Sequence, residues 1–326
     1  MNYKGEISKK ISERAKSGSE FLFVIDFDCS EYYIFTPEEA AINNVFYDFE
    51  GKTNYSYNNR ETNISNKYFN YSPIDFQTYF KGFNRCKEAL HRGDTYLINL
   101  TFQTPLETDY SLEEIFVLSN AKFKLFFKNR FVVFSPERFI RISDGKIETT
   151  PMKGTIDASI PFAEEKLLDN KKELFEHNTI VDLLRNDLNL VAHKVSVEKF
   201  RYIDYLNTNK CNLLQMSSVI SGQLSGDYNS HLGEIICKLL PAGSVTGAPK
   251  EKTVRTILEA ENYKRGFYTG VFGYFDGKNT DVAVSIRFVE NVNGQFLYKS
   301  GGGITALSDP KEEYDEMLKK IYVPVF

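Results

Sequence analysis

Two ionisable residues, Glu137 and Lys153, are brought together by a predicted hairpin. Asp144-Gly145 is typical of a tight two-residue turn, and folding the chain about it sets Glu137 opposite Met152 and beside Lys153. Directly opposed side chains on paired strands lie about 5 Å apart. The pair could be an exposed ion pair that contributes little to stability. It could equally be a lysine nucleophile with a carboxylic acid that protonates a leaving group.

The backbone on both sides of Lys153 is unusual for a solvated lysine. Pro151 precedes it and Gly154 follows it, so the amine has a restricted, turn-like support. This support speaks for a positioned amine, but the spacing alone leaves both interpretations open.

A glycine-rich segment at residues 241–250 leads into a predicted helix. Pro249 suits the first helical position, and the small residues before it leave backbone N–H groups free at the helix N-terminus. Such a terminus binds anions, and Ser244, Thr246 and Lys250 would add donors. A plain connecting turn is the alternative, and we prefer the anion site.

A third group of residues combines an arginine with glycines. Residues 281–287 alternate as a strand, and a turn at Asn293-Gly294 sets Arg287 opposite Ser300 and the glycines at 301–303. A guanidinium beside exposed backbone N–H groups suits a carboxylate. An arginine on a solvent-facing strand is the alternative, but the small neighbours favour a pocket.

Acidic residues lie on two predicted helices. Glu176 is on the first, while Glu313, Glu316 and Lys320 share one face of the last helix. Isolated helical glutamates are usually solvated, and alone these would be interpreted in that way. Two carboxylates that converge on a bound anion would instead suit Mg²⁺, which favours one or two protein carboxylates with substrate oxygens.

The elements that must position these residues alternate between helices and short hairpins. We place a boundary near residue 75, with a short N-terminal segment (1–75) packing on a core of residues 76–326 in one structural unit. Antiparallel hairpins mixed with long helices imply an α+β fold. The pattern predicts helices at 5–16, 76–92, 164–186, 249–260 and from 310, and strands at 21–27, 95–102, 123–127 and 131–134.

Composition excludes several classes of protein. The 326 residues carry a net charge of −4, which gives no basic footprint for nucleic acid. The apolar run at residues 21–25 is too short to span a membrane. Four dispersed cysteines are typical of reduced thiols in the cytoplasm, where we expect the protein. The sequence has no HExxH, GxSxG or GxGxxG motif, and the segment at 243–250 departs from the phosphate-loop spacing.

Four motifs stand out in the sequence: Pro151-x-Lys-Gly-Thr155, Ile180-Val-Asp-Leu-x-Arg-Asn-Asp187, Gly243-Ser-x-Thr-Gly-Ala-Pro-Lys250 and Ser300-Gly-Gly-Gly-Ile304. Together they resemble the chorismate-utilising enzymes, which include anthranilate, isochorismate, salicylate and aminodeoxychorismate synthases. The likeness runs in order from about residue 75 to 320. It implies a large α/β sandwich of antiparallel sheets with flanking helices, in which residues 76–326 bind chorismate and Mg²⁺ bridges to a substrate carboxylate.

Lys153 distinguishes branches of that family. The resemblance implies that anthranilate, isochorismate and salicylate synthases generally carry Ala at this position, whereas aminodeoxychorismate synthases carry Lys. The expected reaction is therefore formation of 4-amino-4-deoxychorismate from chorismate and ammonia, for 4-aminobenzoate and folate synthesis. Lys153 would be the nucleophile and Glu137 the general acid. The resemblance further implies Glu176 and Glu316 as Mg²⁺ ligands, and as substrate contacts Thr246, Gly247, Lys250, Arg287, Tyr298, Gly303 and Lys320.

The sequence departs from the family pattern at Gln215, where some relatives carry His. Glutamine cannot relay a proton, so no acid–base role is assigned to this position. No glutaminase signature is found, so ammonia would come from a separate glutamine amidotransferase subunit. The alternatives are an isochorismate or anthranilate synthase, and a non-catalytic chorismate-binding subunit.

Overall fold

The computed structural model describes residues 3–56, 67–207 and 212–323. The apolar run near the N-terminus forms strand β1 (Phe21–Ile25), in which all five residues are buried. Leu22 and Val24 pack toward a second sheet, whereas Phe21, Phe23 and Ile25 pack toward helices. Because both faces of this strand are covered, the sequence is continuously apolar instead of alternating.

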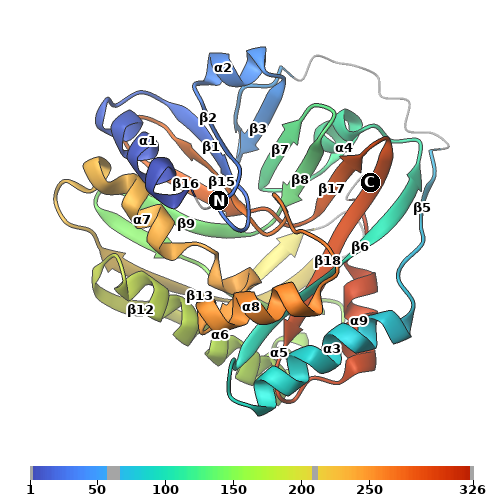
Figure 1. Cartoon of the computed structure of the whole chain (residues 1–326). Coiled ribbons are helices and arrows are strands. Elements are labelled where there is room, and N and C mark those ends of the chain that lie inside the picture. Colours follow the sequence, from blue (N-terminus) through green and yellow to red (C-terminus); the bar gives the residue numbers. More distant parts are fainter. Residues whose placement is uncertain (1–2, 57–66, 208–211, 324–326) are drawn as a thin grey trace.

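Two antiparallel sheets lie against each other, as Figure 1 shows, and aromatic side chains pack between them. In the described residues, sheet A has the order β11-β13-β10-β9-β16-β15-β1-β2 with β12 beside β13, and sheet B has the order β14-β6-β18-β17-β8-β7-β3-β4 with β5 beside β6. The further strands of sheet A are β2 (Tyr32–Phe35), β9 (Arg138–Ser143), β10 (Lys146–Thr149), β11 (Met152–Asp157), β12 (His193–Asn207), β13 (Asn212–Gln223), β15 (Val271–Phe275) and β16 (Thr280–Val284). Those of sheet B are β3 (Val45–Phe49), β4 (Lys52–Thr53), β5 (Phe69–Tyr71), β6 (Leu97–Thr108), β7 (Phe123–Phe127), β8 (Phe131–Ser135), β14 (Gly247–Ala248), β17 (Phe288–Val292) and β18 (Gln295–Ile304).

Helices cover the outer faces of both sheets (Figure 1). Helices α1 (Lys4–Lys16), α6 (Lys171–Asn189) and α7 (Leu232–Leu239) pack on sheet A. Helices α3 (Phe76–His91), α8 (Lys250–Ala260) and α9 (Pro310–Lys319) pack on β6 and β18 of sheet B, and α4 (Leu112–Leu118) packs beside β8. The remaining helices are α2 (Pro37–Ile42) and α5 (Ala163–Asp169), with short 3-10 turns η1 (Tyr228–His231) and η2 (Gly243–Val245).

The α+β class, the antiparallel sandwich and the flanking helices are confirmed. The predicted helix at 164–186 is wrong in one respect, because it is two helices that meet at Asn170. The Asn170 side chain accepts hydrogen bonds from the backbone N–H groups of Lys172 and Glu173, at 3.0 and 3.2 Å. This cap starts a new helix and sets the direction of α6.

Residues before Phe76 contribute to both sheets. β1 lies between β15 and β2 in sheet A, β3 pairs with β7 in sheet B, and β5 pairs with β6. None of the helices in the described ranges is long and apolar enough to cross a membrane. Cys29, Cys86 and Cys237 are free and buried, while Cys211 lies outside the described residues.

Candidate active site

A cavity of about 270 Å³ lies between the two sheets, close to the lower end of the range for small-molecule sites. β6, β11, β18 and α9 supply its walls, together with the loops before β9 and β17. The side chains on these walls that can do chemistry come from four of the predicted groups, and they include Glu137, Lys153, Ser244, Arg287, Glu316 and Lys320.

Lys153 reaches the cavity from β11. Its Nζ atom lies 3.3 Å from Oε2 of Glu176 on α6, and its side chain is 30% exposed. Gly154 follows with a φ of +76°, and a Cβ there would stand 2.9 Å from a methyl carbon of Leu167. Glycine is therefore favoured beside the lysine, chiefly by the backbone angle, while a Cβ would also displace the end of the Leu167 side chain.

The predicted hairpin is correct only in its first half. β9 and β10 pair with the expected register, Ile142 opposite Ile147. The expected pairing of Glu137 with Met152 is wrong, because β11 leaves the hairpin and pairs with β13, where Met152 lies opposite Ser217. Glu137 and Lys153 still line the same cavity. The chain bends between β10 and β11, and this bend brings Lys153 on β11 to the end of the hairpin where Glu137 lies.

Glu137 lies in the short link between β8 and β9. Its backbone N–H donates to Oγ of Ser135 at 3.1 Å, and its carbonyl accepts from the N–H of Val284 at 3.1 Å. Its Oε1 accepts a 2.6 Å hydrogen bond from Oγ of Ser244. Burial raises the pKa of Glu137, and the Ser244 bond and the charge of Lys153 oppose that rise. A carboxyl with a raised pKa is suited to donate a proton.

The glycines of β18 form one wall. A Cβ on Gly303 would stand 3.8 Å from Nζ of Lys153, so the amine lies against bare backbone. Arg287, with a φ of +55°, projects from the link before β17. Its Nε lies 3.3 Å from Oη of Tyr322, and within the described residues its two terminal nitrogens make no hydrogen bond. A free guanidinium fork is suited to a carboxylate.

Carboxylates from α6 and α9 gather at the other side of Lys153. Burial raises the pKa of Glu173, and the charges of Glu176 and Glu316 raise it further. Burial likewise raises the pKa of Glu313, with Glu316 and Glu176 adding to the effect. These mutually repelling carboxylates are stabilised when a cation binds among them.

Two lysines balance part of this charge. Nζ of Lys320 lies 2.7 Å from Oε1 of Glu316 and donates to the carbonyl of Gly301 at 2.9 Å. Burial lowers the pKa of Lys320, and Lys153 and Arg287 lower it further against the effect of Glu316. Burial also lowers the pKa of Lys153, but the carboxylates of Glu176 and Glu316 outweigh it, so that pKa is raised.

Three predicted substrate contacts do not line the cavity. Lys250 points elsewhere, with its Nζ 2.9 Å from Asp187 and 2.6 Å from the carbonyl of Leu239. Tyr298 is fully buried beneath the wall. Thr246 is also buried, and its backbone carbonyl accepts from the N–H of Asn99. Its neighbour Gly247 does line the cavity.

Two cavity residues escaped the sequence reasoning. Tyr268 lines the wall, and burial raises its pKa above the usual range, against the charges of Arg265 and Arg287. Asn99 lines the wall from β6, and its buried Oδ1 has no hydrogen-bond partner in the described chain. The alternation of β6, which places Ile98 and Leu100 on the opposite face, is a signal that could have identified Asn99. The sequence around Tyr268 offers no comparable signal. Gln215, the departure from the family pattern, also lines the cavity.

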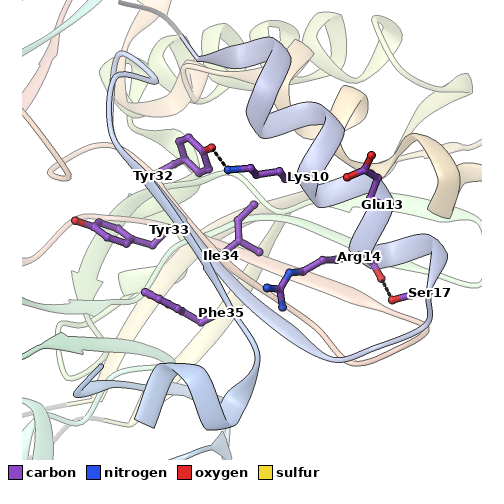
Figure 2. Close-up of a pocket in the computed structure, with 8 residues that line it drawn as sticks. All are labelled: Lys10, Glu13, Arg14, Ser17, Tyr32, Tyr33, Ile34 and Phe35. Carbon is purple, nitrogen blue, oxygen red and sulfur yellow. Dashed lines mark hydrogen bonds between the residues drawn. The ribbon is translucent and has the colours of Figure 1, made fainter. Parts of the chain in front are cut away.

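A second hollow, of about 560 Å³, lies between α1 and β2 (Figure 2). Its charged groups are already paired: Lys10 lies 2.8 Å from Glu6 and donates to Oη of Tyr32, and Arg14 lies 3.2 Å from Glu39. The cavity between the sheets has charged side chains with atoms left to bind a ligand, and this open hollow has no comparable set. The cavity between the sheets is therefore the candidate active site.

Comparison with known proteins identifies the family. Residues 19–325 match the chorismate binding enzyme family. A protein of Haemophilus influenzae named "Uncharacterized PabA-like protein" is 46% identical over 310 residues, which cover 95% of this chain and 94% of that protein. Aminodeoxychorismate synthase component 1 of Escherichia coli is 33% identical over 270 residues, which cover 75% of this chain but only 56% of that protein.

Solved structures agree on the fold. An isochorismate synthase of Bacillus anthracis aligns with a TM-score of 0.72 at 20% identity, over 99% of this chain and 88% of that chain. The anthranilate synthase component I of Streptococcus pneumoniae aligns with a TM-score of 0.68 at 25% identity, over 79% of this chain and 60% of that chain. This chain therefore belongs to the chorismate-binding enzyme family and has its fold.

Proposed function

We propose that the protein is an aminodeoxychorismate synthase of the component 1 type, which converts chorismate and ammonia to 4-amino-4-deoxychorismate. The observation that carries this proposal is the amine of Lys153, which lies in the cavity against the bare backbone of Gly303. An amine so placed can approach a ring carbon without a side chain in the way. Sequence identity alone does not separate the two activities, because the component 1 enzyme of Escherichia coli is 33% identical and an anthranilate synthase component 1 of Aquifex aeolicus is 31% identical.

The chemistry needs a nucleophile and an acid. The charges of Glu176 and Glu316 raise the pKa of Lys153, so the amine first releases a proton to water. The uncharged amine then attacks C2 of chorismate, the ring double bond shifts, and the C4–oxygen bond breaks. Glu137 gives its proton to the departing hydroxyl, which leaves as water. Ammonia then adds at C4, the double bond shifts back, and the bond from C2 to Lys153 breaks to return the amine. The new C4 ammonium gives a proton back to the carboxylate of Glu137, which restores the acid. The raised pKa of Glu137 supports its role as the proton donor.

The substrate carboxylates need cationic and N–H partners. Arg287 and Lys320 supply charge on the cavity wall, and Gly303 supplies bare backbone between them. Tyr268, beside Arg287, is a further contact that we propose in place of the buried Tyr298. Gly247 lines the pocket and Thr246 supports it from behind. We propose a structural role for Lys250, because Asp187 already holds its amine.

Magnesium fits the carboxylates of α6 and α9. The ionised forms of Glu173 and Glu313 are destabilised by the charges around them, which a cation would offset. The described residues contain no group of three ligating side chains that could hold a metal alone. Mg²⁺ would therefore rest on Glu176 and Glu316 and on oxygens of substrate and water. When bound, it would neutralise these carboxylates and help hold a substrate carboxylate.

Ammonia would come from a glutamine amidotransferase subunit in the cytoplasm, as the family resemblance and the name component 1 of the relatives suggest. The prediction is that free ammonium supports turnover by the purified chain, whereas glutamine supports it only when such a subunit is added.

The experiment is incubation of the purified chain with chorismate, Mg²⁺ and ammonium, with products separated and identified by mass. We expect 4-amino-4-deoxychorismate from the wild type. Lys153→Ala and Lys153→Arg should each lose at least about 100-fold in rate, whereas Lys311→Ala, an exposed lysine on α9, should not. Anthranilate or isochorismate as the product would refute the proposal, and binding without turnover would favour a non-catalytic subunit.

A further inference from the structure

Ser244 is placed to control the acid, not to bind an anion. It lies in η2, at the start of the glycine-rich segment, and its Oγ donates to Oε1 of Glu137 at 2.6 Å. Both residues line the cavity. The hydroxyl is thus engaged by a protein carboxyl at the position where the sequence predicted a donor to a bound anion.

The second carboxyl oxygen of Glu137 is left for the substrate. Among the residues that the structure describes, no hydrogen bond engages Oε2, while the backbone is held at both its N–H and its carbonyl. Ser244 is the donor in this bond, so Oε1 acts as the accepting, carbonyl-type oxygen, and the proton of the protonated acid then lies on Oε2. The Ser244 bond therefore directs the proton to the oxygen that is free to meet a leaving group.

We propose that Ser244 is a positioning residue for the general acid: it fixes the rotamer of Glu137 and selects the oxygen that carries the catalytic proton. This inference rests on the proposed function, in which Glu137 protonates the departing hydroxyl. It replaces the anion-site role that the glycine-rich segment suggested for Ser244.

The same bond favours the ionised form of the acid. An O–H donor stabilises a carboxylate more than a carboxylic acid, so loss of the donor raises the pKa of Glu137. The charged groups that act on Glu137 are Lys153 on β11, Arg287 before β17 and Lys320 after α9. None of these contacts changes in a variant of Ser244, so the variants isolate the hydroxyl.

The test compares Ser244→Ala and Ser244→Thr with the wild type. At a pH below the binding midpoints of both proteins, Ser244→Ala should lower kcat about tenfold and change KM less than about twofold, because the acid is misaligned but the substrate contacts remain. Ser244→Thr keeps a hydroxyl and should restore most of the loss. Ser143→Ala, a serine in the β9–β10 hairpin away from the cavity, serves as the control and should match the wild type.

A second readout does not depend on turnover. Chorismate carries two carboxylates, so its affinity should fall as Glu137 ionises with rising pH. Calorimetric titrations at several pH values locate that midpoint, and Glu137→Gln, which cannot ionise, identifies it. Ser244→Ala should move the midpoint upward by about one pH unit, and Ser244→Thr should leave it in place.

The outcomes separate this inference from the proposed function. A raised KM with kcat and midpoint unchanged would assign Ser244 to substrate binding and overturn the inference. A fall in kcat with no shift of the midpoint and no rescue by threonine would reduce it to a structural residue. A different product from the wild type would refute the proposed function alone, because the binding midpoint still reports the link between Ser244 and Glu137.

Discussion

The amine of Lys153 on β11 lies 3.3 Å from a carboxylate oxygen of Glu176 on α6. The two residues are held there by different devices: Gly154 shapes the strand after the lysine, and the Asn170 cap sets the start of α6. Because this contact joins the proposed nucleophile to a proposed metal ligand, a change in one residue should be felt at the other.

The first prediction concerns Glu176→Gln, which keeps the size of the side chain but removes its charge. Magnesium affinity in the presence of chorismate should fall, and kcat/KM should drop on the order of 100-fold or more. Calorimetry of Mg²⁺ binding and initial rates measure the two effects. Glu312→Gln is the matched control, because Glu312 is 68% exposed and contacts Lys172. Equal losses in both variants would contradict a specific role for Glu176.

The second prediction contrasts two glycines of the cavity wall. A Cβ on Gly302 would stand 3.5 Å from Glu313 and 3.9 Å from Glu316, which is ordinary contact. Gly302→Ala should therefore fold normally, with a thermal midpoint close to that of the wild type. Its methyl group would occupy space beside the proposed ligands, so Mg²⁺-dependent chorismate binding should weaken about tenfold.

Gly247→Ala should behave in the opposite way. Gly247 has a φ of +117°, and its Cβ would stand 1.9 Å from the carbonyl oxygen of Leu97. The backbone must move, so we expect a loss of about 2–4 kcal/mol in the free energy of unfolding. Urea denaturation of the two variants side by side checks the contrast, and a Gly247→Ala protein as stable as Gly302→Ala would contradict it.

Contacts between residues close together in the sequence were predicted more accurately than contacts between residues far apart in the sequence. The β9–β10 register follows from a two-residue turn, and it is correct. The pairing of Met152 with Ser217 joins residues far apart in the chain, and no local pattern indicates it. The direction of Lys250 fails for the same reason, because its partner Asp187 lies on α6.

The motifs located the cavity but not every residue on its wall. Residues of all four motifs line one space, among them Lys153, Ile180, Gly247 and Gly303. Glu137 and Arg287, outside the motifs, line the same space. Tyr268 lies on the cavity wall, where the sequence predicted Tyr298. This difference arises because the link before β15 turns toward the cavity. A side chain's direction in an irregular link is set by packing, which the sequence pattern does not contain.

The third prediction concerns the buried pair of Arg265 and Glu261. Arg265 donates to Glu261 at 2.6 and 2.9 Å, and also to the carbonyl oxygens of Asn99 and Val245 on the cavity wall. Arg265→Met would leave a carboxylate buried without its partner, which costs about 3–5 kcal/mol. The double variant with Glu261→Leu should lose less than the sum of the single losses. Urea denaturation of the four proteins tests this, and additive losses would contradict it.

The fourth prediction concerns the pH dependence of stability. Burial raises the pKa of Asp26 to about 6, although Ser30 donates two hydrogen bonds to it, at 2.8 and 2.7 Å. In the unfolded chain the pKa of an aspartate is about 3.9. The folded state therefore holds this proton more tightly, and its contribution to stability is present below about pH 4 and is lost as the pH rises through about 6.

Asp26→Asn should remove that dependence. Relative to the wild type, the variant should gain about 2–3 kcal/mol in the free energy of unfolding between pH 4 and pH 7. Urea denaturation at half-unit steps of pH measures the difference. Asp28→Asn is the companion variant: because the charge of Asp28 also raises the pKa of Asp26, its removal should move the transition to lower pH without abolishing it. A difference between Asp26→Asn and wild type that stays constant across this range would show that Asp26 ionises equally in both states, and the burial argument would fail.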